Sequence, residues 1–103
     1  MVTDPLVQKV VRQVTEAVHP TQVIAFGSRV WGGARETSDV DLMVLYDGPQ
    51  STREIQRAIH RLFAHPEFSL DVFVMTPKEW ERDKRIANTL AREVAERGVI
   101  CYG

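Results

Sequence analysis

The chain has 103 residues, which suffices for one small domain and leaves too few for a second domain to bury a core of its own. It is 44% hydrophobic and 26% charged, with a formal net charge of −1, and this balance argues against a nucleic-acid-binding protein, which would carry a basic surface and a high pI. The single cysteine excludes an internal disulfide framework, and the sequence shows neither a signal-peptide pattern nor an apolar run of membrane-spanning length. We therefore expect one soluble, cytoplasmic domain over residues 1–103, without a membrane partner.

The first predicted element is an amphipathic helix from Pro5 to about Val18. Thr3 or Asp4 can serve as its N-cap, and a proline in the first turn leaves no hydrogen bond unmade. The pair His19-Pro20 ends the helix, since a residue before proline avoids the α conformation. Its apolar residues recur at helical spacing and form one face: Leu6, Val7, Val10, Val11, Val14, Ala17 and Val18.

A strand is predicted from Gln22 to Phe26, ending at Gly27-Ser28. A glycine at this point lets a ligand come close to the backbone N–H groups, so that a phosphate could bind there. A short helix is expected over Arg29 to Gly33, and residues 32–38 are expected to form a mobile connection.

The strand from Val40 to Tyr46 is the clearest in the sequence. Residues 42–45 are apolar on both faces, which predicts a central strand covered on both sides. Asp39 and Asp41, at its start, are two residues apart and therefore point to the same face. Two carboxylates placed in this way can bind the same metal ions.

A helix follows from the capping-box pattern at residues 51–54 to about Ala64, where His65-Pro66 ends it. The third strand, Leu70 to Met75, carries Asp71 near its start. Further helical structure is expected over residues 76–97, with an interruption near residues 83–85, and residues 99–102 could add a short edge strand. The inward-facing residues of the second long helix are expected to be Ile55, Ile59, Leu62 and Phe63.

The connections predict how the strands lie. Gly27-Ser28 and Asp39 can meet after so short a connection only if the first two strands run antiparallel, whereas the helix between the second and third strands predicts a parallel pair with a right-handed crossover. Asp71 then lies at the same end of the sheet as Asp39 and Asp41. The expected fold class is α/β, with a mixed sheet of three to four strands flanked by helices and three carboxylates that converge on one site.

A glycine-serine turn beside three carboxylates is typical of metal-dependent phosphoryl or nucleotidyl transfer. Oxygen ligands suit Mg²⁺, with Mn²⁺ as a substitute, and two ions about 3.5–4 Å apart could hold a triphosphate and stabilise the pyrophosphate leaving group. In the structural alternative, Asp39 is only a strand-end residue and Asp41 is the single anomaly. The pattern of Gly-Ser, ten residues and Asp-x-Asp arises by chance in about one chain in a thousand of this length, which favours the functional interpretation.

Three segments resemble the motifs of the DNA polymerase beta nucleotidyltransferase superfamily: Gly27-Ser28-Arg29, Ser38-Asp39-Val40-Asp41-Leu42-Met43-Val44 and Leu70-Asp71-Val72-Phe73-Val74. Over its whole length the chain is similar to the minimal, MntA-like members, which are often encoded beside a HEPN-domain protein. The resemblance implies the nucleotidyltransferase fold, with ATP as the donor. It implies that Gly27 and Ser28 hold phosphate, and that Asp39 and Asp41 bind both metal ions. It also implies that Asp71 completes one metal site and helps to activate the acceptor hydroxyl.

In MntA-like antitoxins the acceptor is a tyrosine of the HEPN toxin, which is adenylylated and inactivated. The resemblance therefore implies a Mg²⁺-dependent protein adenylyltransferase that is the antitoxin of a toxin–antitoxin pair. Two alternatives stay open: an antitoxin that acts by binding alone, and nucleotidyl transfer to a small molecule. Assembly with further copies of the chain, through an edge strand or an apolar helix face, is also open.

Other residues near the motifs have two interpretations each. Arg29 and Arg35 could neutralise phosphate charge, because arginine binds phosphate in a bidentate manner, or they could belong to an arginine-rich surface. Minimal members commonly have a small residue and an Arg-Gly pair after the Gly-Ser pair, whereas this chain has Arg29-Val30-Trp31-Gly32-Gly33. Trp31 could stack on a base, but packing explains it more simply. The remaining residues of this group are expected in the core: Phe63, Phe68, Phe73, Trp80 and Cys101.

Overall fold

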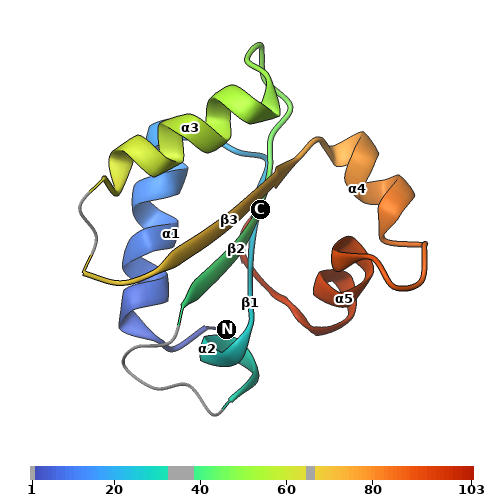
Figure 1. Ribbon diagram of the computed structural model, residues 1–103, viewed down its shortest axis with the longest axis horizontal. Coiled ribbons are helices and arrows are strands. Elements are labelled where there is room, and N and C mark those ends of the chain that lie inside the picture. Colours follow the sequence, from blue (N-terminus) through green and yellow to red (C-terminus); the bar gives the residue numbers. More distant parts are fainter. Residues whose placement is uncertain (1, 33–38, 65–66) are drawn as a thin grey trace.

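The computed structural model describes residues 2–32, 39–64 and 67–103, and its helices lie on both sides of one sheet (Figure 1). The elements are, in chain order, α1 (Pro5–Val18), β1 (Gln22–Phe26), α2 (Ser28–Trp31), β2 (Val40–Leu45), α3 (Thr52–Leu62), β3 (Leu70–Met75), α4 (Pro77–Asp83), α5 (Leu90–Arg97) and β4 (Val99–Tyr102). These bounds confirm the predicted order of helices and strands. The helical segment after β3 is divided more widely than expected, because residues 84–89 separate α4 from α5.

The strand order in the sheet is β3-β2-β1-β4. β1 runs antiparallel to both β2 and β4, whereas β2 and β3 are parallel. The predicted strand directions and the central position of β2 are therefore confirmed, and so is the fold class, a mixed sheet flanked by helices. In this register Phe26 lies opposite Asp41 on one side, and Asp41 lies beside Asp71 on the other.

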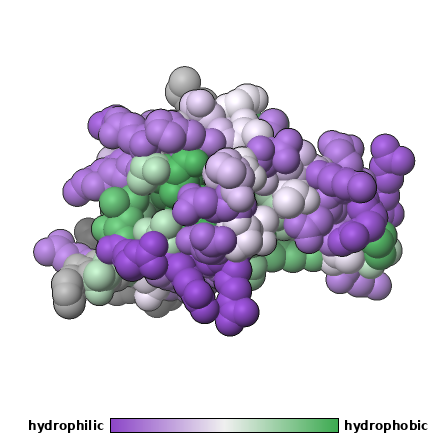
Figure 2. Space-filling view, turned by 90° about the horizontal axis from the view of Figure 1, so that it is seen from above, coloured by the Kyte–Doolittle hydropathy of each residue, from purple (hydrophilic) through white to green (hydrophobic). Residues whose placement is uncertain are grey.

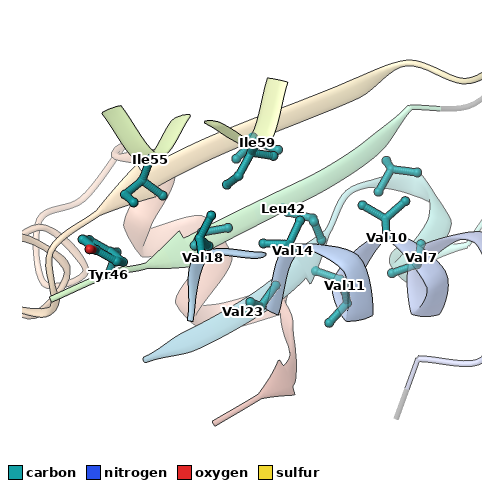
Figure 3. Packing of buried hydrophobic residues seen from close by; sticks show 14 of the residues in the cluster. Val7, Val10, Val11, Val14, Val18, Val23, Leu42, Tyr46, Ile55 and Ile59 are labelled. Atoms are coloured by element: carbon teal, nitrogen blue, oxygen red, sulfur yellow. The ribbon is translucent and has the colours of Figure 1, made fainter. Parts of the chain in front are cut away.

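Two apolar layers hold the helices against the sheet. Helices α1 and α3 cover one face, where Val10 and Val14 pack with Leu42 and Ile59 (Figure 3). Helices α4 and α5 cover the opposite face, where the buried residues are Ile24, Phe26, Met43, Leu45, Trp80, Ala91 and Val94. Alternation along β2 explains this division, because neighbouring residues of a strand point to opposite faces. β2 is thus buried on both sides, as its continuous apolar run predicts.

Two of the residues expected in the core are exposed, so that these two predictions are wrong. Phe73 is 41% exposed because it lies on β3, an edge strand, beside a hollow that α4 and α5 leave open. Leu62 is 44% exposed, since the apolar stripe of Ile55 and Ile59 continues at Phe63, the residue that directly follows α3, and leaves Leu62 outside it. Cys101, Phe63 and Phe68 are half-buried against the first layer, and Trp80 is buried in the second.

Hydrophilic side chains cover most of the face seen in Figure 2, with hydrophobic side chains in limited areas. The large hydrophobic residues that are exposed on the described parts of the molecule are Leu62, Phe73, Ile86, Ile100 and Tyr102. Within residues 2–32, 39–64 and 67–103, no helix combines the length and the apolar character that crossing a lipid bilayer requires.

Candidate active site

Three aspartates from neighbouring elements meet at one end of the sheet. Asp39 directly precedes β2, Asp41 is the second residue of β2, and Asp71 is its partner on the parallel strand β3. One carboxylate oxygen from each residue lies within 4.8 Å of the other two. Asp39 and Asp71 are exposed, and Asp41 is half-buried. The convergence expected from strand topology is therefore observed, on the sheet face that α4 and α5 cover.

The electrostatics of this cluster are unfavourable without a cation. The pKa of Asp41 is raised from 3.8 to about 6, first by burial, then by the nearby charges of Asp71 and Asp39, and also by hydrogen bonding with Asp71. Carboxylate oxygens are the ligands that hard divalent cations such as Mg²⁺ prefer. The donor set and its mutual repulsion thus fit a divalent metal ion, which would relieve the repulsion.

Gly27 brings the end of β1 against this cluster. Its φ of +83° lies in a region that side-chain-bearing residues rarely adopt. A Cβ atom at this position would overlap Asp41 Oδ2 and lie 3.0 Å from Asp41 Cγ. Because Phe26 is the register partner of Asp41, the turn that follows, Gly27-Ser28, lies at the same end of the sheet as the carboxylates. Ser28 is exposed there, as the first residue of α2.

Residues 7–101 match the family described as the nucleotidyltransferase domain. The chain belongs to this family. The match includes the Gly27-Ser28 turn and all three clustered aspartates.

The fold of this nucleotidyltransferase is similar to that of a solved protein from Sulfolobus solfataricus that is provisionally named a nucleotidyltransferase. The TM-score is 0.60 and the sequence identity is 21%, over 92% of this chain and 75% of the other. At this identity the likeness supports the fold alone. No curated protein is significantly similar to the chain in sequence.

Arg29 of the nucleotidyltransferase makes an ion pair with α1. Its Nη1 atom lies 3.0 Å from Asp4 Oδ2, and the two side chains are 7% and 20% exposed. Burial alone would raise the pKa of Asp4, but hydrogen bonds from Arg29, Val7 and Leu6 outweigh it and hold this pKa below its usual value. The expected phosphate contact of Arg29 stays a prediction, and Arg35 lies outside the described residues.

Trp31 packs, in agreement with the simpler interpretation of this residue. Its ring centroid lies 6.2 Å from that of Phe26, and its Nε1 atom donates a hydrogen bond of 2.8 Å to the backbone carbonyl of Arg97. The Arg97 guanidinium lies 4.0 Å from the Trp31 ring centroid. Sequence reasoning did not find the contacts of Asp4 or Arg97 with α2, because each joins residues far apart in the chain.

The acidic cluster is an open surface feature of the nucleotidyltransferase. Two larger hollows, of about 540 and 620 Å³, lie beside α1, and neither is lined by any of the three aspartates. A smaller hollow of about 240 Å³ is lined by Phe73 and by residues of α5, on the same face as Asp41. Exposure of Asp39 and Asp71 leaves the carboxylates accessible to a large substrate.

Proposed function

We propose that this protein is a Mg²⁺-dependent nucleotidyltransferase that transfers AMP from ATP to a hydroxyl group. One observation carries the proposal: carboxylate oxygens of Asp39, Asp41 and Asp71 lie within 4.8 Å of one another in a chain of the nucleotidyltransferase domain family. The four ion pairs found among residues 2–32, 39–64 and 67–103 involve none of the three aspartates.

Each residue of the cluster has a proposed task. Asp39 and Asp41 would bind two Mg²⁺ ions, or Mn²⁺ in their place, and Asp71 would complete one of the two sites. When bound, such ions neutralise the triphosphate and stabilise the pyrophosphate that leaves. Asp71 would also accept the proton of the attacking hydroxyl, whose oxygen forms a bond to the α-phosphorus as the bond to pyrophosphate breaks.

The Gly27-Ser28 turn would hold the phosphates. The absence of a side chain at Gly27 lets the Asp41 carboxylate lie directly against this turn. A phosphate held by the turn and a metal ion held by Asp41 would therefore be close together. The exposed Ser28 could donate its hydroxyl to a phosphate oxygen. In this proposal the glycine and the acids act on the same group, the triphosphate.

The proposed acceptor is a tyrosine of a HEPN-type toxin, which makes the protein a cytoplasmic antitoxin that inactivates its partner by adenylylation. The resemblance to MntA-like proteins supports this choice. The exposed position of Asp39 and Asp71 supports it as well, because a tyrosine presented by another protein could reach the site without first entering a deep pocket.

The test is incubation of a purified HEPN-type partner with ATP and Mg²⁺, followed by intact-mass measurement. We expect the partner to gain one or more AMP units with the wild-type protein, and none with the double variant Asp39→Ala/Asp41→Ala. The matched control is Asp47→Ala, which removes an exposed aspartate beyond the other end of β2 and should transfer AMP normally. Equal labelling by wild type and double variant would contradict the proposal. Tight binding of the wild-type protein without any mass gain would favour an antitoxin that acts by binding alone.

A further inference from the structure

Helix α2, which begins at the Gly27-Ser28 turn, cannot hold its own position. It has four residues, of which Ser28 is exposed and the other three are only half-buried as whole residues. Its backbone bonds are local: the N–H groups of Val30 and Trp31 donate to the Gly27 carbonyl at 3.0 and 2.9 Å. Because the first turn of a helix is costly to form, so short a helix depends on contacts with the rest of the fold.

One such contact joins α2 to α1. The Asp4 carboxylate uses Oδ1 to accept hydrogen bonds from the N–H groups of Leu6 and Val7, at 2.9 and 3.2 Å, and uses Oδ2 to bind Arg29 at 3.0 Å. A charge-assisted hydrogen bond that is largely shielded from water is stronger than a neutral one and is little weakened by salt. The N-cap of α1 therefore also fixes the first turn of α2.

A second contact joins α2 to α5. The indole N–H of Trp31 donates to the carbonyl of Arg97, the last residue of α5, and the Arg97 guanidinium covers the indole ring. Phe26 contacts the same ring. Helices α1 and α5 lie on opposite sides of the sheet in Figure 1, so that α2 is attached to both helical layers.

We propose that Asp4 and Arg97 are positioning residues that hold α2, and with it the Gly27-Ser28 turn, against Asp41. The inference rests on the proposed function, because the place of this turn matters for activity only if the turn binds the triphosphate. Neither residue touches the three clustered carboxylates in the described parts of the chain. Loss of either contact should therefore weaken the binding of nucleotide and leave the binding of metal alone unchanged.

Three substitutions separate these contacts. Asp4→Asn keeps an N-cap for α1 but removes the charge that binds Arg29, and Trp31→Phe keeps the ring but removes its hydrogen bond to Arg97. Arg97→Gln removes the cation over the ring. Matched controls are Asp47→Asn and Arg57→Gln, which change exposed residues elsewhere.

The first measurement is amide hydrogen exchange of the ligand-free protein. We expect the Val30, Trp31 and Gly32 amides to exchange about fivefold faster in each of the three variants, as the loss of one hydrogen bond or one cation–π contact allows, while the amides of β2 keep their wild-type rates. The two controls should leave all these rates unchanged. Unchanged exchange at α2 in all three variants would overturn the inference.

The second measurement is the dissociation constant of MgATP without an acceptor, compared with that of Mn²⁺ alone. We expect each variant to raise the MgATP constant about fivefold, and Asp4→Asn combined with Arg97→Gln to raise it about twenty-five-fold, because the two contacts are separate. The Mn²⁺ constant should not change, whereas a general disturbance of the fold would weaken both ligands.

Faster exchange at α2 with unchanged MgATP affinity would overturn the positioning of the turn by these residues. Failure of the wild-type protein to bind MgATP at all would overturn the proposed function instead, whatever the exchange rates of α2. The two failures are therefore distinguishable.

Discussion

Gly27 shows how a single missing side chain shapes the site. Its positive φ and the closeness of Asp41 are separate constraints. Gly32 offers a comparison, because it has a positive φ of +105° and no described atom lies within 4 Å of the position that an added Cβ would take. A substitution at Gly32 thus meets only the backbone constraint, whereas one at Gly27 meets both.

We expect Gly27→Ala to destabilise the protein more than Gly32→Ala does. Each change should cost about 1–3 kcal/mol, because both glycines combine a positive φ with a ψ near 180°, a backbone conformation that is essentially restricted to glycine. Gly27→Ala should add a further cost by pushing the Asp41 carboxylate aside. Urea unfolding measures both free energies, and AMP transfer should be lost only in Gly27→Ala. Equal costs in the two variants would show that Asp41 yields freely to a methyl group.

The second residue-scale prediction concerns pH. The pKa of Asp41 is raised from 3.8 to about 6 in the folded protein, by burial and then by the charges of Asp71 and Asp39. A group that binds its proton more tightly when folded contributes stability that is complete below its unfolded pKa and is lost as pH rises through its folded pKa. Without divalent cations, stability should therefore fall by about 1 kcal/mol between about pH 4 and pH 6.5, a figure kept below the full shift because the side chain is partly solvated.

Asp41→Asn cannot ionise and should remove this loss. With EDTA present, we expect the variant to be about 1 kcal/mol more stable than wild type at pH 7.5 and equally stable near pH 4, by urea unfolding. Asp47→Asn, at an exposed site, should match wild type at both pH values. A variant that is less stable than wild type at pH 7.5 would contradict this account of the cluster.

At the scale of elements, local patterns predict most of the bounds, because caps and prolines act within a few residues. The capping box predicted at residues 51–54 is formed, and Thr76, where further helical structure was expected to begin, forms a second one with Glu79. Long-range contacts lack such a signal: the Asp4–Arg29 and Trp31–Arg97 bonds join residues 25 and 66 positions apart. The exposure of Phe73 could not be predicted from the sequence either, because the sequence of a strand does not indicate how much of its surface the helices cover.

The connection between α4 and α5 is the element that the sequence pattern predicted least well. Asn88 takes a positive φ of 66°, and Thr89 then begins α5 by accepting a hydrogen bond from the Arg92 N–H at 3.1 Å. The same hydroxyl lies 2.9 Å from the carbonyl of Asp83, at the end of α4. Thr89 therefore joins both helices, which a helical pattern with a short interruption does not indicate.

We expect Thr89→Ala to lower the free energy of unfolding by about 1–2 kcal/mol, because it removes an N-cap together with this link to α4. Thermal or urea unfolding measures the change. Thr3→Ala, which removes an exposed hydroxyl near the start of α1, should have little effect. If the two variants have the same free energy of unfolding, the hydrogen bonds of Thr89 do not stabilise the connection between α4 and α5.

At the scale of the whole molecule, topology predicts the site. One antiparallel and one parallel pairing suffice to bring Asp39, Asp41 and Asp71 to one end of the sheet. The first pairing follows from a short connection, and the second follows from the helix that joins the two strands. What each carboxylate binds cannot be predicted from topology. The ligand of each carboxylate depends on the local charge and on the groups that surround it.

Metal binding should be visible as stability of the whole fold. A ligand that binds only the folded state raises the free energy of unfolding, by about 1.4 kcal/mol at tenfold excess over its dissociation constant, which corresponds to roughly 5–10 °C in Tm. We expect Mg²⁺ or Mn²⁺ to raise the Tm of wild type at pH 7.5, and to leave Asp39→Ala/Asp41→Ala unchanged. Sodium chloride at equal ionic strength is the control. A shift of the same size in the double variant would place the ions elsewhere.

The order of the strands means that the aspartates of the cluster are not all held equally firmly in the sheet. Asp41 lies on β2, which is paired with a strand on each side, whereas Asp71 lies on β3, which is at the edge of the sheet. Local opening of an edge strand costs less free energy than local opening of a central strand, because the edge strand is hydrogen-bonded on one side only. Displacement of β3 would remove Asp71, and with it the proposed proton acceptor and one ligand of one metal site, but would leave Asp39 and Asp41 in place. We therefore expect transfer to be lost more readily than the binding of the first metal ion. A partner protein that binds along β3 and prevents this opening would therefore raise the rate of the proposed AMP transfer.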